Sequence, residues 1–469
     1  MSAIRQQVPK ALVWFVPLVL FAAPADTVTT LAGSPGVGGH ADGAGSAALF
    51  LSPKAMSVDV RGNIYTSDNF CGTLRKIDPA GNVITLAGPV SGACAFGSVD
   101  GAPADARFAS PSGTAVDTAG NVYVADSGNC TVRMVTPGGV VSTLAGVASE
   151  CVAIDGPKAT ARFNGLAGIT VDRGNNVYVT SYHGCTVRKI TPAGTVTTLV
   201  GTDSVCATVD GAGAAARLNN PSGIATNGDG NFYVADETGC TIRRITSDGV
   251  VTTLAGTPDT CGSSDGTGAA AGFHVPSWTA VDVWGNVFAS DYLNFTIRMI
   301  TPSGVVTTLA GLAGAQGSAD GPGTDARLNH PDGIAVDGAG TVYFADRNNN
   351  TVREITPSAN VDALPAAQVS VTASGLAYSR VTQTYNGVIT IRNVSGAPVA
   401  GPFEVALASL PPGVSLVNYS DWRSGNPVIL VPGVTVLAAG QSATVAIRLT
   451  NSSSNSIRFT PILYAEPVY

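Results

Sequence analysis

Residues 184–211 read GCTVRKITPAGTVTTLVGTDSVCATVDG, and two cysteines, Cys185 and Cys206, bracket a strand–turn–strand pattern in this stretch. The runs TVRKI and VTTLV are rich in β-branched residues, which favour strands. The turn between them carries a glycine where a tight hairpin needs a positive φ. The same arrangement recurs before and after this stretch, so it predicts one unit of a repeated β architecture.

A six-residue phrase at the end of the hairpin marks the period of the repeat. It occurs as VTTLAG at 28–33, VITLAG at 83–88, VSTLAG at 141–146, VTTLVG at 196–201, and VTTLAG at 251–256 and 306–311. The leucines of successive copies lie 55, 58, 55, 55 and 55 residues apart. Each copy is followed by Asp-Gly, with the aspartates at Asp42, Asp100, Asp155, Asp210, Asp265 and Asp320. The period indicates six units that stack against one another.

Each unit contains four short strand-like segments separated by turns, as in PSGTAVD at 111–117, NVYVAD at 121–126 and CTVRMV at 130–135. Four short antiparallel strands cannot bury both their faces alone, so the units must pack face to face around an axis. The sequence therefore predicts an all-β fold, with a six-bladed β-propeller over residues 26–362. The sixth unit ends in a degraded fourth strand, ITPSANVDAL, so we expect residues 28–33 to supply the outer strand of the last blade and close the ring by strand exchange.

The run PDGIAVDGAGTVYFADRNNNTVREI at 331–355, with ADGPGTDARLNH before it, resembles NHL repeats, and the resemblance covers roughly residues 27–362. Two copies depart from the pattern: LAGITVD at 166–172 lacks the leading proline, and PSWTAVD places Trp278 where other copies have glycine or alanine. The resemblance implies a binding or scaffolding fold. Some relatives of this architecture are secreted lyases or lactone hydrolases, so the fold does not decide the function.

The N-terminal residues 1–25 have the pattern of a signal peptide. Arg5 and Lys10 precede the apolar run ALVWFVPLVLFAA, and small residues follow at Ala23 and Ala25. A membrane-anchoring helix is the alternative, but the run is short and interrupted by proline. Cleavage would change the formal net charge from −7 to −9, because two basic residues are removed. We therefore expect a secreted protein, extracellular or periplasmic, without membrane insertion after cleavage and without a nucleic-acid partner.

The cysteines fall in two loops that the propeller places on the same face. One loop joins the second and third strands of a blade, and the other joins the fourth strand to the next blade. The repeat therefore predicts four local disulfides, Cys71–Cys94, Cys130–Cys151, Cys185–Cys206 and Cys240–Cys261. Zinc ligation is the alternative, but zinc sites prefer close cysteine pairs, and no two of these cysteines lie close together in sequence. An oxidising destination also favours disulfides.

Arginines recur in the third strands, at Arg75, Arg133, Arg188, Arg243, Arg298 and Arg353. A middle strand is covered by neighbouring blades, and a buried charge needs a partner. We therefore expect ion pairs with the aspartates that end the second strands, Asp68, Asp126, Asp236, Asp291 and Asp346, rather than an anion-binding ring. The Asp-Gly aspartates are expected to cap turns in the linkers.

After residue 362 the repeat stops. Residues 363–368 read as a linker, and residues 369–469 contain short alternating runs such as GVITIRNVS and ATVAIRLTN between turn signals. This pattern predicts an immunoglobulin-like β-sandwich, without an inter-sheet disulfide because the segment has no cysteine.

The functional prediction is a secreted, non-enzymatic binding or scaffold protein that recognises a protein or glycan through the disulfide-tied face. The expected contact residues on that face and at the axial mouth are Tyr182, His183, Trp278, Tyr292, His330, Lys54 and Asp332. Trp278 has the alternative role of filling the channel, and Lys54 that of pairing with Asp332. We assign no cofactor, metal or catalytic residue.

The alternative function is a propeller enzyme, a lyase or lactone hydrolase with an axial metal. It requires His, Asp or Glu at the axial ends of the first strands, and those positions form a poor ligand set: Lys54, Ser112, Ala167, Ser222, Ser277 and Asp332. The four histidines, His40, His183, His274 and His330, fall in segments assigned to the linker face, where a metal site is conceivable.

Overall fold

The computed structural model describes residues 26–90, 94–226, 230–283 and 285–356. Beyond these it describes residues 369–373, 377–379, 384–396, 398–400, 403–408, 414–416, 421–423, 426–431, 436–451 and 460–465. The expected signal peptide, residues 1–25, and the expected linker, residues 363–368, lie outside the described residues. The domain boundaries therefore stay predictions.

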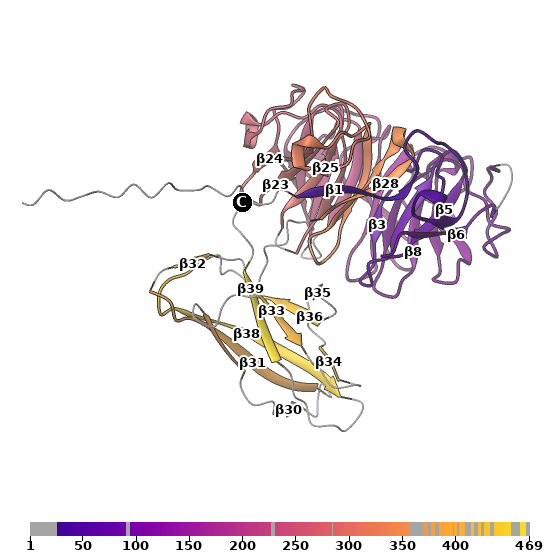
Figure 1. Ribbon diagram of the computed structural model, residues 1–469. Helices are drawn as coiled ribbons and strands as arrows, with labels where there is room; N and C mark the ends of the chain where they lie inside the picture. Colours follow the sequence, from indigo (N-terminus) through magenta and orange to yellow (C-terminus); the bar gives the residue numbers. More distant parts are fainter. Residues whose placement is uncertain are drawn as a thin grey trace, which may run out of the picture.

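Six antiparallel sheets form the blades, and the innermost strand of each blade contacts that of the next around a closed ring (Figure 1). The strands of the first three blades, from the axis outward, are β3 (Ser57–Val58), β4 (Ile64–Asp68), β5 (Thr73–Ile77) and β6 (Asn82–Ala87); β7 (Pro111–Val116), β8 (Val122–Asp126), β9 (Thr131–Val135) and β10 (Val141–Ala145); and β11 (Leu166–Val171), β12 (Val177–Ser181), β13 (Thr186–Ile190) and β14 (Val196–Val200). Those of the last three are β16 (Pro221–Thr226), β17 (Asn231–Asp236), β18 (Thr241–Thr246) and β19 (Val250–Ala255); β21 (Pro276–Val281), β22 (Val287–Asp291), β23 (Thr296–Ile300) and β24 (Val305–Gly311); and β26 (Pro331–Val336), β27 (Val342–Asp346), β28 (Thr351–Thr356) and β1 (Thr27–Gly33).

Short elements extend the outer edges and the loops. Two-residue strands pair with the outer strands of four blades: β2 (Gly43–Ala44), β15 (Gly211–Ala212), β20 (Gly266–Thr267) and β25 (Gly321–Pro322). The 3-10 turns are η1 (Gly45–Ala47), η2 (Ser127–Asn129), η3 (Gly213–Ala215), η4 (Gly268–Ala270), η5 (Gly323–Asp325) and η6 (Arg347–Asn349).

The strand-exchange closure is confirmed. β1 pairs with β28 in antiparallel register, with Val28 opposite Ile355, and its other edge pairs with β25. Figure 1 shows this N-terminal strand lying among the strands of the last blade. Val28 and Ala32 are fully buried, so β1 supplies core side chains as well as backbone hydrogen bonds.

The third-strand arginines form the expected internal ion pairs. All six guanidinium groups are buried, and five of them pair with the aspartate that ends the second strand; in the fifth blade Arg298 lies 2.8 Å from Asp291. The Asp-Gly aspartates, which were expected to cap turns in the linkers, each pair with an arginine. Asp265 lies 2.8 Å from Arg298 and accepts the backbone N–H of Thr308 in the outer strand. One arginine therefore joins the second strand, the third strand and the preceding linker.

The third blade departs from this arrangement. Its second strand ends in Ser181 instead of aspartate, so the buried Arg188 has Asp155 as its one carboxylate partner among the described residues. The Oγ of Ser181 is buried and has no hydrogen-bond partner. In the other blades the aspartate at this position also accepts a backbone N–H seventeen residues upstream, as Asp126 does from Ala109 at 2.7 Å.

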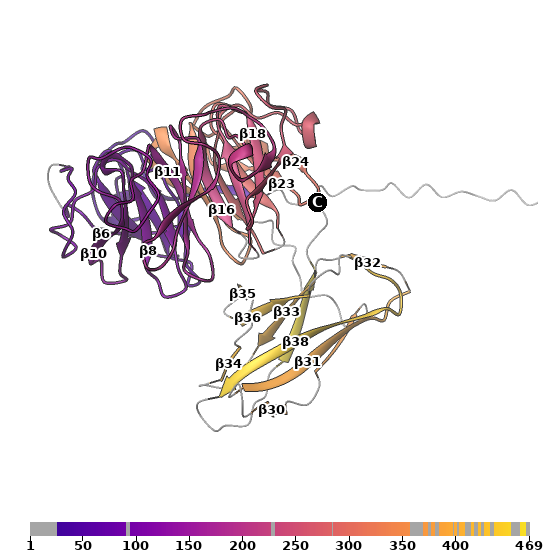
Figure 2. The ribbon, with the colours of Figure 1, turned by 180° about the vertical axis from the view of Figure 1, so that it is seen from behind.

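The C-terminal strands form a body of their own in both views (Figures 1 and 2). One sheet has the order β29-β31-β38-β34 with β30 on β31, another has the order β35-β36-β33-β39, and β32 pairs with β37. These strands are β29 (Val369–Ala373), β30 (Ala377–Ser379), β31 (Thr384–Asn393), β32 (Val399–Ala400), β33 (Phe403–Ala408), β34 (Val414–Leu416), β35 (Asp421–Arg423), β36 (Asn426–Leu430), β37 (Val436–Leu437), β38 (Ser442–Asn451) and β39 (Thr460–Ala465). Ile389 and Ile447 of one sheet and Phe403 and Val405 of the other share one apolar cluster, as a sandwich requires. The immunoglobulin-like assignment stays a prediction.

The first testable prediction concerns ring closure. Replacing Val28 with alanine should lower the free energy of unfolding by roughly 1–3 kcal/mol, because it removes two fully buried methyl groups from the closing strand. Ile84 on β6 is a matched control, since its side chain is 51% exposed and Ile84→Ala should change little. Chemical denaturation measures the free energy of unfolding of both variants. Equal effects of the two substitutions would contradict a stabilising role of β1.

The second prediction concerns the ion pairs. Asp126→Ser leaves the buried Arg133 with a single carboxylate and should cost about 3–5 kcal/mol. The reverse change in the third blade, Ser181→Asp, supplies a carboxylate for Arg188 and for the upstream backbone N–H. It should raise the free energy of unfolding by roughly 1 kcal/mol. Thermal unfolding compares the two variants with the wild type, and a lower melting temperature for Ser181→Asp would refute this account of the third blade.

Candidate functional site

A cavity of about 670 Å³ opens at the axial end of the propeller on the face that carries the disulfides. Two rings of equivalent positions line it, one residue from every blade in each ring. The inner ring, near the start of the innermost strands, comprises Lys54, Ser112, Ala167, Ser222, Ser277 and Asp332. The outer ring, directly after the second strands, comprises Asn69, Ser127, Tyr182, Glu237, Tyr292 and Arg347.

The two rings differ from the rest of the repeat because their side chains are not the same from blade to blade. The framework around them repeats a buried arginine and its aspartates in nearly every blade. The ring positions instead carry cations, acids, tyrosines, an amide and hydroxyl groups. The fold therefore holds twelve side chains in equivalent backbone positions and gives the cavity a chemically asymmetric wall.

On one side of the cavity, Tyr182 donates its phenolic hydrogen to Oε1 of Glu237 at 2.9 Å. Burial, with the charge of Glu237 adding to it, raises the pKa of Tyr182 to about 12. Burial also raises the pKa of Glu237, while hydrogen bonds from Tyr182 and Ser222 oppose this shift. The carboxylate of Glu237 is therefore held by neutral donors.

On the other side, Arg347 pairs with Asp332 at 3.2 Å, and its Nε donates to Oγ of Ser52 at 2.8 Å. The alternative pairing of Lys54 with Asp332 is not formed. The described residues give the half-buried Lys54 no ion pair, and burial lowers its pKa although the charge of Asp332 opposes this. The carboxylate of Asp332 is instead paired with Arg347 of the same blade.

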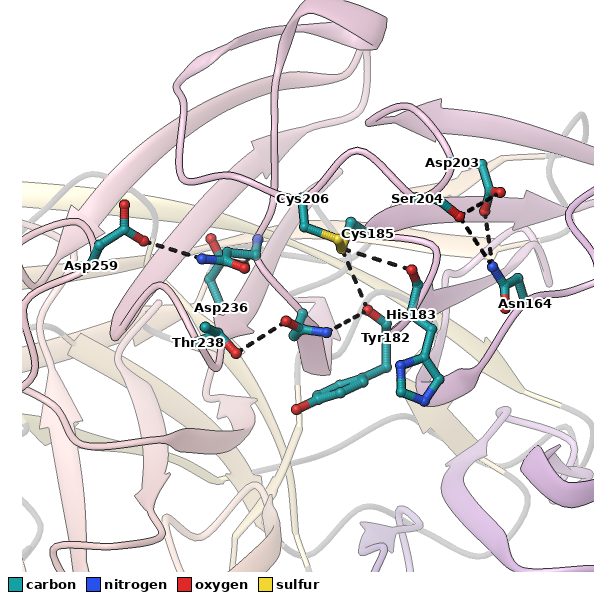
Figure 3. The surroundings of a disulfide bond; sticks show 12 residues. Asn164, Tyr182, His183, Cys185, Asp203, Ser204, Cys206, Asp236, Thr238 and Asp259 are labelled. Atoms are coloured by element: carbon teal, nitrogen blue, oxygen red, sulfur yellow. Dashed lines mark hydrogen bonds between the residues drawn. A yellow bond between two sulfur atoms is a disulfide. The ribbon is translucent and has the colours of Figure 1, made fainter.

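His183 is exposed beside Tyr182, and the two rings meet edge to face with centroids 5.2 Å apart. Figure 3 shows both side chains next to the Cys185–Cys206 disulfide, where Sγ of Cys185 lies 3.6 Å from the carbonyl oxygen of Tyr182. The disulfide thus fixes the backbone that presents these two residues to the cavity.

The four predicted disulfides are all present, each within the expected pair of loops. Cys130 and Cys151 line the cavity themselves. The wall also includes the small residues Ser112 and Gly128 of the second blade and Ala167 of the third. The Cys130–Cys151 disulfide is therefore part of the cavity wall.

Two of the expected contact residues do not line the cavity. Trp278 is 2% exposed and packs among the apolar side chains between blades, because it follows the cavity-facing Ser277 and alternate residues of a strand point in opposite directions. His330 lies behind the wall, where its ring stacks on Tyr292 at 4.7 Å and its Nδ1 is 2.8 Å from Oδ1 of Asn329. Lys54, Tyr182, His183, Tyr292 and Asp332 do come together in the cavity.

Sequence reasoning missed four residues of the outer ring, Asn69, Ser127, Glu237 and Arg347. The signal that identifies them is the offset within the repeat. Tyr182 and Tyr292 directly follow the last residue of their second strands, and the four missed residues occupy the same offset in the other blades. We singled out the tyrosines by residue type, whereas the position in the unit defines the site.

Among the described residues, one group has the composition of a metal site, namely His40, Asp68 and Cys71. It lies away from the cavity lining, and Cys71 is bonded to Cys94. The other three histidines do not converge, since His183 and His274 are exposed in different blades and His330 contacts asparagines. The described part of the chain thus gathers no histidine and carboxylate ligands at the axis.

Comparison with known proteins agrees with the architecture. The NHL repeat family model matches residues 108–133, which span β7 to β9 of the second blade. This match supports an NHL-repeat β-propeller. The chain is 25% identical to mouse (Mus musculus) Teneurin-3 over 69% of its length, but it spans 13% of the length of that relative.

Solved structures resemble the NHL-repeat propeller at the level of fold. A Bacteroides thetaiotaomicron protein of unknown function matches with a TM-score of 0.55 and 20% identity, covering 71% of this chain and 76% of the other. An auxiliary nutrient binding protein of the same organism matches with a TM-score of 0.55 and 18% identity, covering 71% and 77%. Within the described residues, no helix has the length and apolar character needed to span a membrane.

The third prediction concerns the disulfides. Replacing both Cys130 and Cys151 with alanine should lower the free energy of unfolding by about 3 kcal/mol, because the bond closes a loop of 21 residues. The Cys240 and Cys261 pair closes a loop of the same separation outside the cavity, so its removal is the matched control and should cost a similar amount. Denaturation of both variants measures the cost. Peptide mapping without reduction should recover the four local pairs, and cross-blade links would contradict them.

Proposed function

We propose that this NHL-repeat protein is a secreted, non-enzymatic binding or scaffold protein that recognises a protein or glycan ligand through the axial cavity and its disulfide-tied loops. The observation that carries the proposal is the asymmetry of the cavity wall. The repeated framework of the blades presents different side chains to the cavity, which is the arrangement that selective recognition requires.

The loops that present the wall are held rigidly. Four disulfides fix loops of the first four blades, and η6 and its buried Asn349 order the corresponding loop of the sixth. A surface that is already ordered loses little conformational entropy when it binds a ligand. The rigidity therefore supports binding at this face.

The chemistry of the wall suits a ligand that offers hydrogen-bonding groups and apolar faces. Tyr182 and Tyr292 supply aromatic surface with polar tips, and the serines and Asn69 supply donors and acceptors. Glycans and polypeptides both have this character. The predicted signal peptide and the disulfides support an extracellular or periplasmic location, and the predicted sandwich module would position the propeller face.

The similarity to an auxiliary nutrient binding protein is in line with a binding role but shows the fold alone. The alternative function is an enzyme, a lyase or lactone hydrolase with an axial metal. The inner ring gives it little support, because the ring offers one carboxylate, Asp332, and this carboxylate is paired with Arg347. Metal analysis of the purified protein separates the two functions, because stoichiometric zinc or calcium would favour the enzyme.

The fourth prediction tests the binding face. A glycan and peptide array probed with the full mature chain should yield ligands whose binding is lost when Tyr182 and His183 are both replaced by alanine. The matched control replaces Val60 and Arg61, two exposed residues of the hairpin on the opposite face. Binding that survives the Tyr182 and His183 change, and is instead lost on removing residues 366–469, would place recognition in the C-terminal module.

A further inference from the structure

The charged residues of the cavity wall do not all satisfy one another. Asp332 and Arg347 form an ion pair at 3.2 Å. Lys54 has no ion pair among the described residues, and Glu237 receives hydrogen bonds only from the neutral hydroxyl groups of Tyr182 and Ser222. One cation and one anion of the wall are thus left without an ionic partner.

These two charges lie on opposite walls. Lys54 belongs to the first blade and Glu237 to the fourth, and in a closed ring of six blades taken in chain order these blades face each other across the axis. Each charge acts on the other across the cavity, because Glu237 raises the pKa of Lys54 and Lys54 lowers that of Glu237. The described residues show no direct ion pair between Lys54 and Glu237.

Both charges carry a desolvation cost. Burial is the largest cause of the lowered pKa of Lys54 and of the raised pKa of Glu237, which means that the wall disfavours the charged form of each group. A partly buried charge is stabilised when an opposite charge with good hydrogen-bond geometry approaches it. The cavity therefore lacks two groups: an anion beside Lys54 and a cation beside Glu237.

We propose that the cavity binds a zwitterionic small molecule of the class of free amino acids and short peptides, with its carboxylate toward Lys54 and its ammonium group toward Glu237. The inference rests on the proposed function, since it names the ligand of the same cavity. The volume of about 670 Å³ lies within the range of small-molecule pockets. The small residues Ser112 and Gly128 of the second blade and Ala167 of the third leave room for the ligand body, and Tyr182 and Tyr292 supply aromatic surface for it.

The arrangement also selects against other charges. The formal charges of Lys54, Arg347, Glu237 and Asp332 sum to zero. A ligand with net negative charge therefore meets two carboxylates, and one with net positive charge meets two basic groups. A neutral sugar leaves both unpaired charges without an ionic partner. Only a ligand with separated opposite charges satisfies both walls, and the penalty for the others is a source of specificity.

The fifth prediction is a calorimetric test on the full mature chain. A panel of free amino acids and of di- and tripeptides should contain ligands that bind the wild type. N-acetylation or C-amidation of the best of them should each weaken binding about tenfold or more, because each removes one charge-assisted contact. These comparisons need only the wild-type protein, so they stand even if a variant does not fold.

Two variants assign the ends of the ligand. Lys54→Met should weaken the zwitterion about tenfold or more but leave the affinity of the C-amidated form unchanged, and Glu237→Gln should do the same for the N-acetylated form. Affinity in the wild type should also fall on both sides of neutral pH. The raised pKa of Glu237 brings its protonation closer to neutrality from below, and the lowered pKa of Lys54 brings its deprotonation closer from above.

Three results overturn the inference. They are blocked ligands that bind as well as the zwitterion, a charge preference unaffected by Lys54→Met and Glu237→Gln, and no binding by any member of the panel. If neutral oligosaccharides bind in a manner that depends on Tyr182 and His183 while no zwitterion does, this inference fails and the proposed function stands. If no ligand of any class depends on Tyr182 and His183, the proposed function fails as well.

Discussion

A buried arginine held between two aspartates is the interaction on which five of the six blades depend, and the third blade keeps one of the two aspartates. In the sixth blade Arg353 lies 2.8 Å from Asp346 and 2.7 Å from Asp320, and Asp320 also accepts the backbone N–H of Thr30 in β1. The same contact that orders the blade thus anchors the strand that closes the ring. Burial raises the pKa of Asp126, Asp236 and Asp291 to about 6 despite their arginines, so desolvation outweighs the attraction in these pairs. These ion pairs therefore act mainly by fixing the geometry of the blade. A buried arginine without its partners is costly, and only one arrangement of the strand and the linker supplies both aspartates.

Because the arginine and aspartate contacts of the framework lie within the blades, the ring positions at the axial mouth contribute little to folding and can differ between blades. Ser277 is followed by the core residue Trp278, and Tyr182 by the exposed His183. The disulfides add to this independence of the mouth from the core, because they fix the loops by bonds that lie outside the sheets. Recognition can therefore be changed by substitutions at the mouth without altering the contacts that hold the blades together.

The period of the sequence predicted what depends on repetition: the blade count, the closure by residues 28–33, the four disulfides and the arginine pairs. It did not predict what depends on the reach or direction of one side chain. Trp278 was expected at the mouth, but strand alternation turns it into the core. Lys54 was expected as one possible partner of Asp332, but Arg347 forms the ion pair with it. Glu237 was missed because residue type guided the choice of site residues, although its offset in the repeat equals that of Tyr182.

In the first blade, a cysteine at a different position in the loop changes the contacts around the aspartate that ends the second strand. Cys71 stands three residues after Asp68, where the second, fifth and sixth blades have an asparagine that donates to the aspartate, as Asn129 does to Asp126 at 2.7 Å. A cysteine bonded to Cys94 cannot make this contact. His40 from the preceding linker occupies the space, with its Nε2 2.8 Å from the carbonyl oxygen of Pro89 and its Nδ1 3.7 Å from Asp68. The arginine of this blade, Arg75, is also farther from Asp68, at 3.4 Å, than its equivalents at 2.7 to 2.8 Å. The blade therefore keeps its disulfide with a longer ion pair, and His40 lies near Asp68 without making the hydrogen bond that the asparagine makes in other blades.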